Sequence, residues 1–442
     1  MKKVLIMGAG LSSTWLIQYL EEKARKYGWE LRVADRDPQA VKAKINPPAE
    51  AIELNVLKEE ERDRLVKDAD VVVSMLPAEF HILVARSCLK YGKSLITASY
   101  EDDAMRALHK EALDKGIIIL NEMGLDPGID HMSAMQILDR IKGEGHELRG
   151  FESFTGGLVA PESDNNPWHY KFSWNPEKVV RAGQGTAKFI QEGKIKYIPY
   201  NRLFRRTEVI TIEPFGKFEG YANRDSMKYI EKYRLQGIPT IYRGTLRRPG
   251  FGQAWNVFVQ LGATDDSYTM ENTEDMTYRE FINSFLYYSE RDSVELKLYH
   301  YMHIDQDSHI IEKLKWLGIF EDTRIGLKNA TPARILEHIL NQKWQLEPED
   351  KDMVVMWHKI SYREEGKAKP VELTSSLGVI GEDRMKTAMA KTVGLPLGIA
   401  AKLILTGDIK TRGVCIPTWP EIYDPVIREL DSFGVSFNEK QI

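Results

Sequence analysis

Cysteine is almost absent, because the 442 residues include only Cys88 and Cys415. Two cysteines are too few for a disulfide framework or a structural zinc site, so we expect a reducing, cytoplasmic setting. The ten histidines also lack metal-ligand spacing. His300 and His303 lie close together, but no third ligand accompanies them. We therefore predict no metal site and a structural role for these two histidines.

Long hydrophobic runs and an excess of one charge are missing as well. No apolar run approaches the ~20 residues needed to span a bilayer, and the apolar start of the chain, Val4–Met7, is too short for a secretory signal. The net charge is only −4, with both signs mixed along the chain. This balance predicts no attraction to nucleic acid or to an anionic membrane. The length suffices for two or three domains with their own cores.

A glycine turn between a strand and a helix is the first positive feature. The run Val4–Met7 leads into Gly8-Ala9-Gly10-Leu11-Ser12-Ser13, and an amphipathic helix is predicted from there to about Tyr27. In dinucleotide-binding folds the first glycine permits the tight turn, and the second lets the backbone approach the pyrophosphate at the helix N-terminus. Ser13 stands where a third glycine is usual. With a second strand expected at Leu31–Ala34, the pattern favours a dinucleotide site.

The second predicted strand ends at Asp35-Arg36, which carries two opposing signals. An acid at this place normally accepts hydrogen bonds from the ribose hydroxyls of NAD and repels a 2′-phosphate. An arginine beside it can pair with that phosphate or stack on adenine. Arg36 as a solvated surface residue is the alternative interpretation. These two residues leave the form of the cofactor open.

Apolar and helical segments continue to alternate as far as Leu120, which predicts a parallel, doubly wound sheet. Ligands bind beyond the carboxyl ends of the strands in such sheets. Two predicted strand ends are Leu76-Pro77 and Thr97-Ala98-Ser99-Tyr100. We expect both to line the nicotinamide side, with Ser99 and Tyr100 within reach of a substrate.

The stretch NEMGLDPGIDHM, Asn121–Met132, concentrates polar and turn-forming residues after the apolar run Ile117–Leu120. Pro127 lacks an N–H and Gly128 tolerates any φ, so a fixed turn is predicted before a helix that starts near His131. The acids Asp126 and Asp130 would then point into the crevice beyond the sheet. Capping of the next helix is the alternative, and it suits Asp130 better than Asp126.

Three segments in the middle of the chain carry candidate ligand groups. The loop PESDNNPWHYKFSWNP is long and polar, and Lys171 and Ser173 are candidate donors to a carboxylate. The alternative is that the aromatic residues of this loop cover a domain interface. Two arginine-bearing loops are predicted at Phe218–Lys228, with Arg224, and at Tyr242–Arg247. Guanidinium groups bind carboxylates bidentately, which suits a substrate with several of them. Surface arginines in salt bridges are the alternative.

Later in the chain, residues Glu271–Lys343 are predicted to be mostly helical, and Asp352–Lys359 and Val371–Val379 to be strands. The apolar segment Thr387–Leu405 is predicted to be a helix that contains glycines. It is expected to return to the first domain and complete it. A separate C-terminal helix is the alternative.

Taken together, NEMGLDPGIDHM, FTGGLVAPESDNNPWHYKFSW, YANRDS, YRGTLR and the C-terminal TVGLPLGIAAKLIL…GDIK resemble the glutamate-forming saccharopine dehydrogenases, also called saccharopine reductases. The matches run in order from Gly8 to the C-terminus and are weakest at Thr264–Arg334. The resemblance implies an α/β protein: a Rossmann domain with a doubly wound parallel sheet completed by the C-terminal segment, an α/β substrate-binding and dimerisation domain, and a small, mostly helical domain. The implied bounds are 1–130 with 387–442, 131–217 with 305–386, and 218–304, respectively.

The resemblance also implies a reaction, in which saccharopine, NADP and water are in equilibrium with glutamate, 2-aminoadipate 6-semialdehyde and NADPH. It implies a homodimer and a small-molecule substrate with several carboxylates. NAD stays possible because similar proteins often lack an acid at Asp35. Some have a cysteine where this chain has Thr155, so a thiol there cannot be essential. A related imine reductase, such as a carboxynorspermidine dehydrogenase, and a non-catalytic NADP-sensing protein are the alternatives.

Functional residues follow from the resemblance by position. We expect Asp126, Arg224 and Thr245 to converge beside the nicotinamide, with carboxylates held by Arg224 and by backbone N–H groups of 244–246. Asp126 and Tyr100 are the acid and base candidates, unless water carries the protons and the two groups only orient it. The implied cofactor contacts are Gly8, Gly10, Leu11, Ser12, Ser13, Asp35, Arg36, Asn55, Val56, Leu76, Pro77, Thr97, Ala98 and Leu125. The implied or candidate substrate contacts are Ser99, Tyr100, Asp126, Lys171, Ser173, Arg224, Gly244, Thr245 and Leu246.

Overall fold

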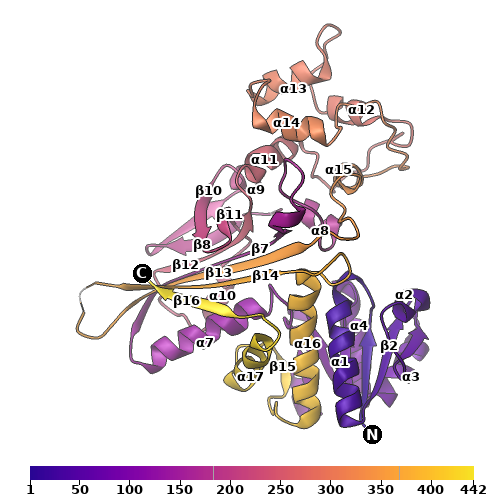
Figure 1. Cartoon of the computed structure of the whole chain (residues 1–442), viewed down its shortest axis with the longest axis vertical. Helices are drawn as coiled ribbons and strands as arrows, with labels where there is room; N and C mark the ends of the chain where they lie inside the picture. The colour runs from indigo at the N-terminus through magenta and orange to yellow at the C-terminus, as the bar shows by residue number, and fades with distance from the viewer. Residues whose placement is uncertain (183, 368) are drawn as a thin grey trace. The chain divides into compact units, whose positions relative to one another are not determined.

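The computed structural model describes residues 1–182, 184–367 and 369–442, which form two compact units (Figure 1). Unit 1 comprises Met1–Leu148, Lys232–Arg234 and Ile360–Ile442, and unit 2 comprises Arg149–Glu231 and Leu235–Lys359. The stretch 218–304, expected to be a separate domain, therefore lies in unit 2 apart from three residues. The chain from residue 360 to 386, expected in the second domain, lies in unit 1.

A seven-stranded sheet, with the order β15-β6-β5-β4-β1-β2-β3, forms the centre of unit 1. Every pairing along it is parallel, and β1 lies between β2 and β4, which is the arrangement of a doubly wound sheet. The strand β15 comes from the C-terminal segment, so the prediction that this segment completes the Rossmann domain is confirmed. The strands are β1 (Lys3–Met7), β2 (Glu30–Asp35), β3 (Glu50–Glu53), β4 (Val71–Ser74), β5 (Ser94–Thr97), β6 (Ile118–Leu120) and β15 (Gly413–Cys415).

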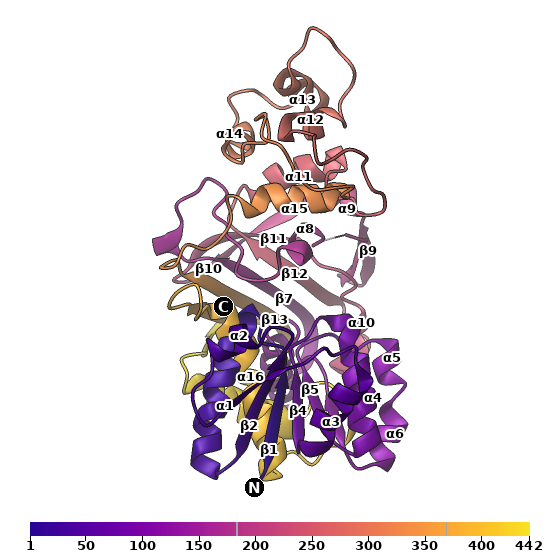
Figure 2. The same cartoon turned by 90° about the vertical axis from the view of Figure 1, so that its right-hand side faces the viewer.

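Helices cover both faces of this sheet (Figure 2). The helices α1 (Thr14–Tyr27) and α16 (Ala388–Thr406) pack closely against each other, because α16 has glycines where they meet. A Cβ atom on Gly394 would lie 2.8 Å from the Leu16 nitrogen, and one on Gly398 would lie 2.6 Å from the Tyr19 ring. The other helices of the sheet are α2 (Pro38–Lys42), α3 (Glu59–Asp68), α4 (His81–Tyr91), α5 (Asp103–Arg106) and α6 (His109–Asp114).

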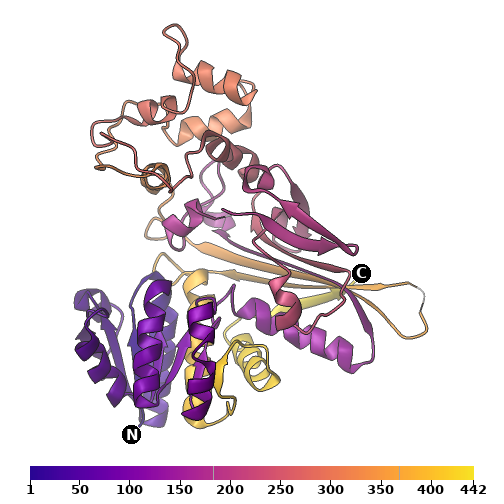
Figure 3. The ribbon, with the colours of Figure 1, turned by 180° about the vertical axis from the view of Figure 1, so that it is seen from behind.

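The helix α16 is long and apolar enough to cross a membrane by length and composition, which the expectation about apolar runs overlooked. Its most apolar window is 78% buried inside the structure, as in the core helix of a folded domain. The rest of unit 1 includes α7 (Ile129–Gly143) and α17 (Pro420–Asp431), which pack together and are seen from behind in Figure 3. The strands β14 (Val371–Ile380) and β16 (Phe437–Gln441) pair antiparallel.

Unit 2 contains a mixed sheet with the order β10-β11-β12-β7-β13. The pairs β10–β11 and β11–β12 are antiparallel, whereas β12 and β7 are parallel. A second ribbon, β8 with β9, is joined to β12. The strands are β7 (Glu147–Val159), β8 (Ala187–Gln191), β9 (Lys194–Ile198), β10 (Thr207–Ile212), β11 (Gly216–Ala222), β12 (Thr240–Arg247) and β13 (Asp352–Arg363).

Aromatic side chains dominate the core of unit 2. Trp168 and Tyr170 are fully buried, with ring centroids 5.2 Å and 5.0 Å from that of Trp344. Trp168 and Tyr170 of the loop after β7 therefore lie in the core of their own unit, rather than covering a domain interface as the alternative interpretation had it. The helices of this unit are α8 (Pro176–Val180), α9 (Tyr200–Leu203), α10 (Lys228–Lys232, which ends in unit 1), α11 (Phe251–Leu261), α12 (Tyr278–Asn283), α13 (Val294–Met302), α14 (His309–Trp316) and α15 (Pro332–Asn341).

Candidate functional site

The glycine turn has the geometry that a bound dinucleotide requires. Gly8 has a φ of +103°, and a Cβ atom there would lie 2.9 Å from the carbonyl carbon and oxygen of Met75. A Cβ atom on Gly10 would meet nothing within 4 Å, so the outer side of the turn is open. Leu11, Ser12 and Ser13 form a short 3-10 helix that leads directly into α1. The close approach behind the turn and the space in front of it fit a pyrophosphate at the helix N-terminus.

Ser13 replaces the third glycine without loss of packing. Its side chain is buried, and its hydroxyl donates a hydrogen bond of 2.8 Å to the carbonyl of Gly10. The hydroxyl therefore satisfies a backbone group of the turn itself. The small side chain permits the close packing that was inferred from the sequence.

The Asp35 carboxylate braces the turn from the end of β2. It accepts hydrogen bonds from the Ala9 nitrogen at 2.7 Å and from the Asp37 nitrogen at 3.0 Å. The neighbouring Arg36 is exposed. Asp35 thus has a structural task in addition to any contact with a ribose.

Lys44, which the sequence did not single out, lies on the same turn. Its ammonium donates hydrogen bonds to the carbonyls of Ala9 at 2.8 Å and Gly10 at 2.5 Å, and lies 3.2 Å from the Ser13 hydroxyl. Burial lowers the pKa of Lys44, while the charge of Asp35 opposes that shift. Only the folding of the segment after α2 back onto the turn brings Lys44 there, so periodicity and motif spacing contained no signal for it.

The remaining predicted cofactor residues follow the carboxyl ends of the strands. Asn55 is exposed after β3 and accepts a hydrogen bond of 3.1 Å from the Leu57 nitrogen, whereas Val56 is buried. Leu76 and Pro77 follow β4, and Thr97 ends β5 with Ala98 after it. The carboxyl ends of parallel strands share one edge of a sheet, so these residues lie along the edge where ligands bind.

A buried histidine connects two of these strand ends. The His81 ring lies with Nδ1 2.8 Å from the Ser74 hydroxyl, and with Nε2 2.7 Å from the Ser99 hydroxyl and 3.0 Å from the Thr97 hydroxyl. The imidazole therefore orients Ser99, one of the predicted substrate contacts. His81 starts a helix in the sequence, and nothing about its spacing revealed this role.

The turn after β6 is compact, as predicted. The Gly124 nitrogen donates to the Pro127 carbonyl at 2.9 Å, and the Gly128 nitrogen donates to the Asp130 carboxylate at 2.6 Å. Asp130 is buried inside the first turn of α7, which begins at Ile129 rather than near His131. Its carboxylate accepts from the turn, whereas the N-cap of α7 is Gly128 and has no side-chain cap hydrogen bond, so the capping alternative for Asp130 is not confirmed.

Asp126 and Tyr100, the two acid and base candidates, are brought together. The Tyr100 hydroxyl donates a hydrogen bond of 3.2 Å to the Asp126 carboxylate, and both residues are half-buried. They reach this position from different strand ends, Tyr100 after β5 and Asp126 after β6. Leu125, a predicted cofactor contact, precedes Asp126 and is buried.

Glu122 holds this turn in place. It is fully buried with a φ of +59°, and its carboxylate lies 2.6 Å from His131 Nε2 and 2.7 Å from the Lys232 ammonium. The Glu101 nitrogen donates to the same carboxylate at 3.0 Å, and Tyr233 lies 2.6 Å from His131 Nδ1. Burial alone would raise the pKa of Glu122, but the His131 ring and the Lys232 ammonium hold that pKa at about 2.

The predicted arginine-bearing loop at Tyr242–Arg247 is instead the strand β12, which is a correction. Gly244, Thr245 and Leu246 pair with β11, and Gly244 and Thr245 also pair with β7. Backbone N–H groups in a strand paired on both sides donate to the neighbouring strands, so presentation of these groups to a carboxylate is not supported. Gly244 has a packing reason to lack a side chain, because its Cβ atom would lie 2.2 Å from the Phe154 ring.

The opposite face of β12 is polar. Side chains alternate along a strand, so Arg243, Thr245 and Arg247 share the face away from Phe154. Both arginines are at most 5% exposed, whereas Thr245 is half-buried. The Arg247 guanidinium carbon lies 5.1 Å from the centre of the Tyr170 ring, and Arg247 Nε has no hydrogen-bond partner among the described residues. This face therefore carries two buried cations, and the buried carboxylate of Glu219 on β11 lies in register with Arg247.

The other candidates of unit 2 differ in their surroundings. Arg224 is exposed after β11, with a φ of +53° and a carbonyl that accepts from the Lys188 nitrogen at 2.8 Å. Lys171 is buried and its ammonium lies 2.5 Å from the Asp350 carboxylate, so that charge already has a partner. Ser173 is buried, and its hydroxyl has no hydrogen-bond partner among the described residues.

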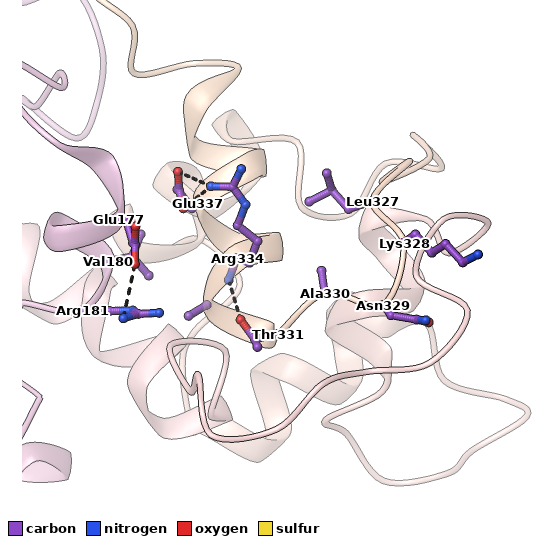
Figure 4. A pocket seen from close by; sticks show the side chains of 11 residues that line it. Glu177, Val180, Arg181, Leu327, Lys328, Asn329, Ala330, Thr331, Arg334 and Glu337 are labelled. Atoms are coloured by element: carbon purple, nitrogen blue, oxygen red, sulfur yellow. Dashed lines mark hydrogen bonds and ion pairs between the residues drawn. The ribbon is translucent and has the colours of Figure 1, made fainter. Parts of the chain in front are cut away.

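A pocket of about 460 Å³ in unit 2 has none of the predicted site residues in its lining (Figure 4). It lies between α8, α15 and the segment before α15. Its arginines are already paired: Arg181 lies 2.9 Å from Asp266, and Arg334 lies 2.8 Å from Glu337. Among the residues that the structure describes, no group of three or more His, Cys, Asp or Glu is arranged to hold a metal ion.

Comparison with known proteins assigns both halves of the chain. The family model for the saccharopine dehydrogenase NADP binding domain matches residues 4–120, and the model for the saccharopine dehydrogenase C-terminal domain matches residues 124–435. The mitochondrial alpha-aminoadipic semialdehyde synthase of Rattus norvegicus is 34% identical over 99% of this chain, which spans 47% of that protein. The chain is thus about half the length of that relative.

Shorter relatives match from end to end. The saccharopine dehydrogenase [NADP(+), L-glutamate-forming] of Saccharomyces cerevisiae is 33% identical over 100% of this chain and 99% of its own length. The solved structure of an apo saccharopine dehydrogenase (L-Glu forming) from the same organism has a TM-score of 0.90, 31% identity and full coverage of both chains. A homospermidine synthase from Legionella pneumophila, solved with NAD, shares the fold with a TM-score of 0.53 at 10% identity.

The buried ion cluster around Glu122 makes a prediction about stability. In Glu122→Gln the Lys232 ammonium and the His131 ring lose a buried carboxylate partner, so we expect the free energy of unfolding at pH 7 to fall by about 3–5 kcal/mol. The pKa of Glu122 is about 2 in the fold against an ordinary 4.5, so its ionised form stabilises the fold above pH 4.5, and this contribution is lost as the pH falls through about 2. Denaturant titrations from neutral to acid pH measure both effects.

A matched control is Glu61→Gln, which removes an exposed carboxylate that pairs with Lys58 at the surface. We expect this variant to unfold as the natural chain does at pH 7. A Glu122→Gln chain with the natural stability and the natural acid dependence would show that the buried cluster does not hold the turn.

Proposed function

The chain belongs to the saccharopine dehydrogenase family, and we propose that it interconverts saccharopine with glutamate and 2-aminoadipate 6-semialdehyde, a reaction of lysine metabolism. In the oxidative direction saccharopine, NADP⁺ and water yield glutamate, the semialdehyde, NADPH and a proton. One observation carries this proposal: the chain matches the yeast saccharopine dehydrogenase over 99% of that protein at 33% identity. The geometry of the strand ends in unit 1 agrees with it.

The cofactor is held by the glycine turn and the strand ends. The open side of Gly10 and the free N–H groups of the following helix suit the pyrophosphate, and the residues after β4 and β5 suit the nicotinamide. NADP⁺, when bound, would accept the hydride that leaves the carbon of the C–N bond. The proposed contacts are Gly8, Gly10, Leu11, Ser12, Ser13, Asp35, Arg36, Asn55, Val56, Leu76, Pro77, Thr97, Ala98 and Leu125.

The substrate carries three carboxylates and two amine nitrogens, so the residues that bind it must include cations and hydrogen-bond donors. Arg224 suits a carboxylate because it is exposed at the end of β11, and Thr245 lies between two buried arginines on β12. The unpartnered hydroxyl of Ser173 is a suitable donor. Lys171 would have to share its ammonium with Asp350. The proposed substrate contacts are Ser99, Tyr100, Asp126, Lys171, Ser173, Arg224 and Thr245.

Asp126 and Tyr100 move or orient the protons. The oxidative reaction requires a base for the secondary amine, then proton transfers as water adds to the imine and the carbinolamine collapses. The Tyr100 hydroxyl donates to Asp126, so the carboxylate is positioned by the phenol and either group can hand a proton to water. The His81 ring, 2.7 Å from the Ser99 hydroxyl, orients that hydroxyl.

We also place the chain in the cytoplasm as a homodimer. Both cysteines are free thiols, which suits a reducing compartment. The strand β10 lies at the end of the unit 2 sheet, and its Val209 is 69% exposed. An exposed apolar residue on an edge strand favours association with a second copy of the chain.

The choice of amine separates this function from the alternatives. We expect rapid NADPH oxidation with 2-aminoadipate 6-semialdehyde and glutamate, because the cationic face of β12 favours an amine that carries carboxylates. Replacement of glutamate by diaminopropane should lower kcat/KM by about two decades or more. Absorbance at the NADPH band follows both reactions. Equal rates would favour a polyamine-type imine reductase, and binding of NADPH without turnover of either pair would favour a sensor.

The roles of Tyr100 and Asp126 are tested by removal of each group. If water relays the protons, Tyr100→Phe and Asp126→Asn each lower kcat only about tenfold, because an oriented water remains in place. Steady-state kinetics as a function of pH measure the effect. Tyr91→Phe is the matched control, because Tyr91 likewise donates to an aspartate, Asp63, at 3.3 Å. A fall of about four decades in kcat with unchanged substrate affinity would refute the relay and make the residue the obligatory acid or base.

A further inference from the structure

The acid at the end of β2 conflicts with the cofactor assigned to the chain, and the surroundings of Asp35 resolve that conflict. A carboxylate at this place normally repels a 2′-phosphate. Here its two oxygens accept from the backbone nitrogens of Ala9 and Asp37, at 2.7 Å and 3.0 Å. The carboxylate is therefore oriented by the turn and by the start of α2.

Lys44 supplies the opposite charge at the same turn. Its ammonium donates to the carbonyls of Ala9 and Gly10, and it lies within electrostatic range of Asp35. The peptide of Ala9 is thus held from both ends, with its N–H bonded to an anion and its carbonyl to a cation. Arg36 adds a second cation beside Asp35. The formal charges of Asp35, Arg36, Asp37 and Lys44 sum to zero, whereas the same sum without Lys44 is −1.

We propose that Lys44 is a specificity-determining residue that favours the 2′-phosphate of NADP by neutralising Asp35. The proposal rests on the proposed function, since it names the residue that adapts the same cofactor site to NADP. An ammonium on the backbone of the glycine turn attracts the pyrophosphate of either cofactor, but only the phosphorylated form places a further anion beside Asp35. The effect of Lys44 is therefore larger for NADP than for NAD.

Partial burial of Lys44 strengthens this discrimination. Burial lowers the pKa of the Lys44 ammonium, so a neighbouring anion gains more from the charge than it would in water. Lys42, two residues earlier, is exposed, and the lysine hydrogen bonds to the turn among the described residues come from Lys44. A lysine that is merely close in the sequence therefore does not take the position of Lys44 on the turn.

The test compares two nucleotides that differ only in the phosphate: adenosine 2′,5′-bisphosphate and adenosine 5′-monophosphate. Isothermal titration of the full chain gives the ratio of their dissociation constants, without any need for turnover. The variant Lys44→Gln removes the charge but keeps an amide that donates hydrogen bonds to the turn. We expect it to lower the preference for the bisphosphate about tenfold or more, since a charge-assisted contact is lost. Lys44→Arg should restore most of the preference, and Lys42→Gln should leave it unchanged.

Each outcome decides the proposal. If Lys44→Gln weakens the binding of both nucleotides by the same factor, Lys44 only shapes the turn. The inference is then overturned, while the proposed function stands. If the natural chain shows no preference for the bisphosphate, the assignment of NADP fails and the inference fails with it. A loss of preference in Lys44→Gln that shrinks at high salt supports the inference, because salt screens the attraction between ammonium and phosphate.

Discussion

The buried carboxylate of Glu122 is the constraint on which the site of unit 1 depends. A glutamate with a φ of +59° is held in a conformation that costs free energy, and it persists because three donors converge on its side chain. One of them, Lys232, comes from a three-residue segment that belongs to unit 1 although the chain on either side of it belongs to unit 2. The same contacts fix the turn that carries Asp126. The fold of this turn therefore depends on one buried anion.

Charged side chains also hold the glycine turn of unit 1. The Ala9 peptide lies between Asp35 and Lys44, so an anion and a cation together define the nucleotide turn. In unit 2 the cations Arg243 and Arg247 are buried on one face of β12, and the opposite face packs on Phe154. Asp35 ends β2 and the two buried arginines lie within β12, so strands fix these charges, whereas Lys44 lies in the turn after α2.

The sequence predicted the Rossmann sheet well because its signals are local. The glycine turn, the alternation of strands with helices and the return of the C-terminal segment as β15 all depend on short patterns. The strand β12 was mistaken for a loop because its arginines and Gly244 suggested a ligand loop. The alternation of Tyr242, Gly244 and Leu246 with polar residues was the period-2 signal of a strand.

Other site features depend on contacts between distant segments and had no local signal. Lys44 and His81 acquire their roles only when the chain folds back on the glycine turn and between strand ends. The burial of Lys171 against Asp350, 179 residues later, likewise turned a predicted ligand donor into half of an ion pair. Residue type and spacing predict what a side chain can do, but its partner is set by tertiary structure.

Transfer of deuterium tests the central claim most directly. NADPH dideuterated at the nicotinamide C4 is incubated with the chain, 2-aminoadipate 6-semialdehyde and glutamate, and the products are examined by mass spectrometry. The account predicts saccharopine that carries one deuterium on the carbon derived from the aldehyde, next to the secondary nitrogen. Deuterium found only in the alcohol of the semialdehyde, or unlabelled saccharopine, would contradict hydride transfer at the C–N bond.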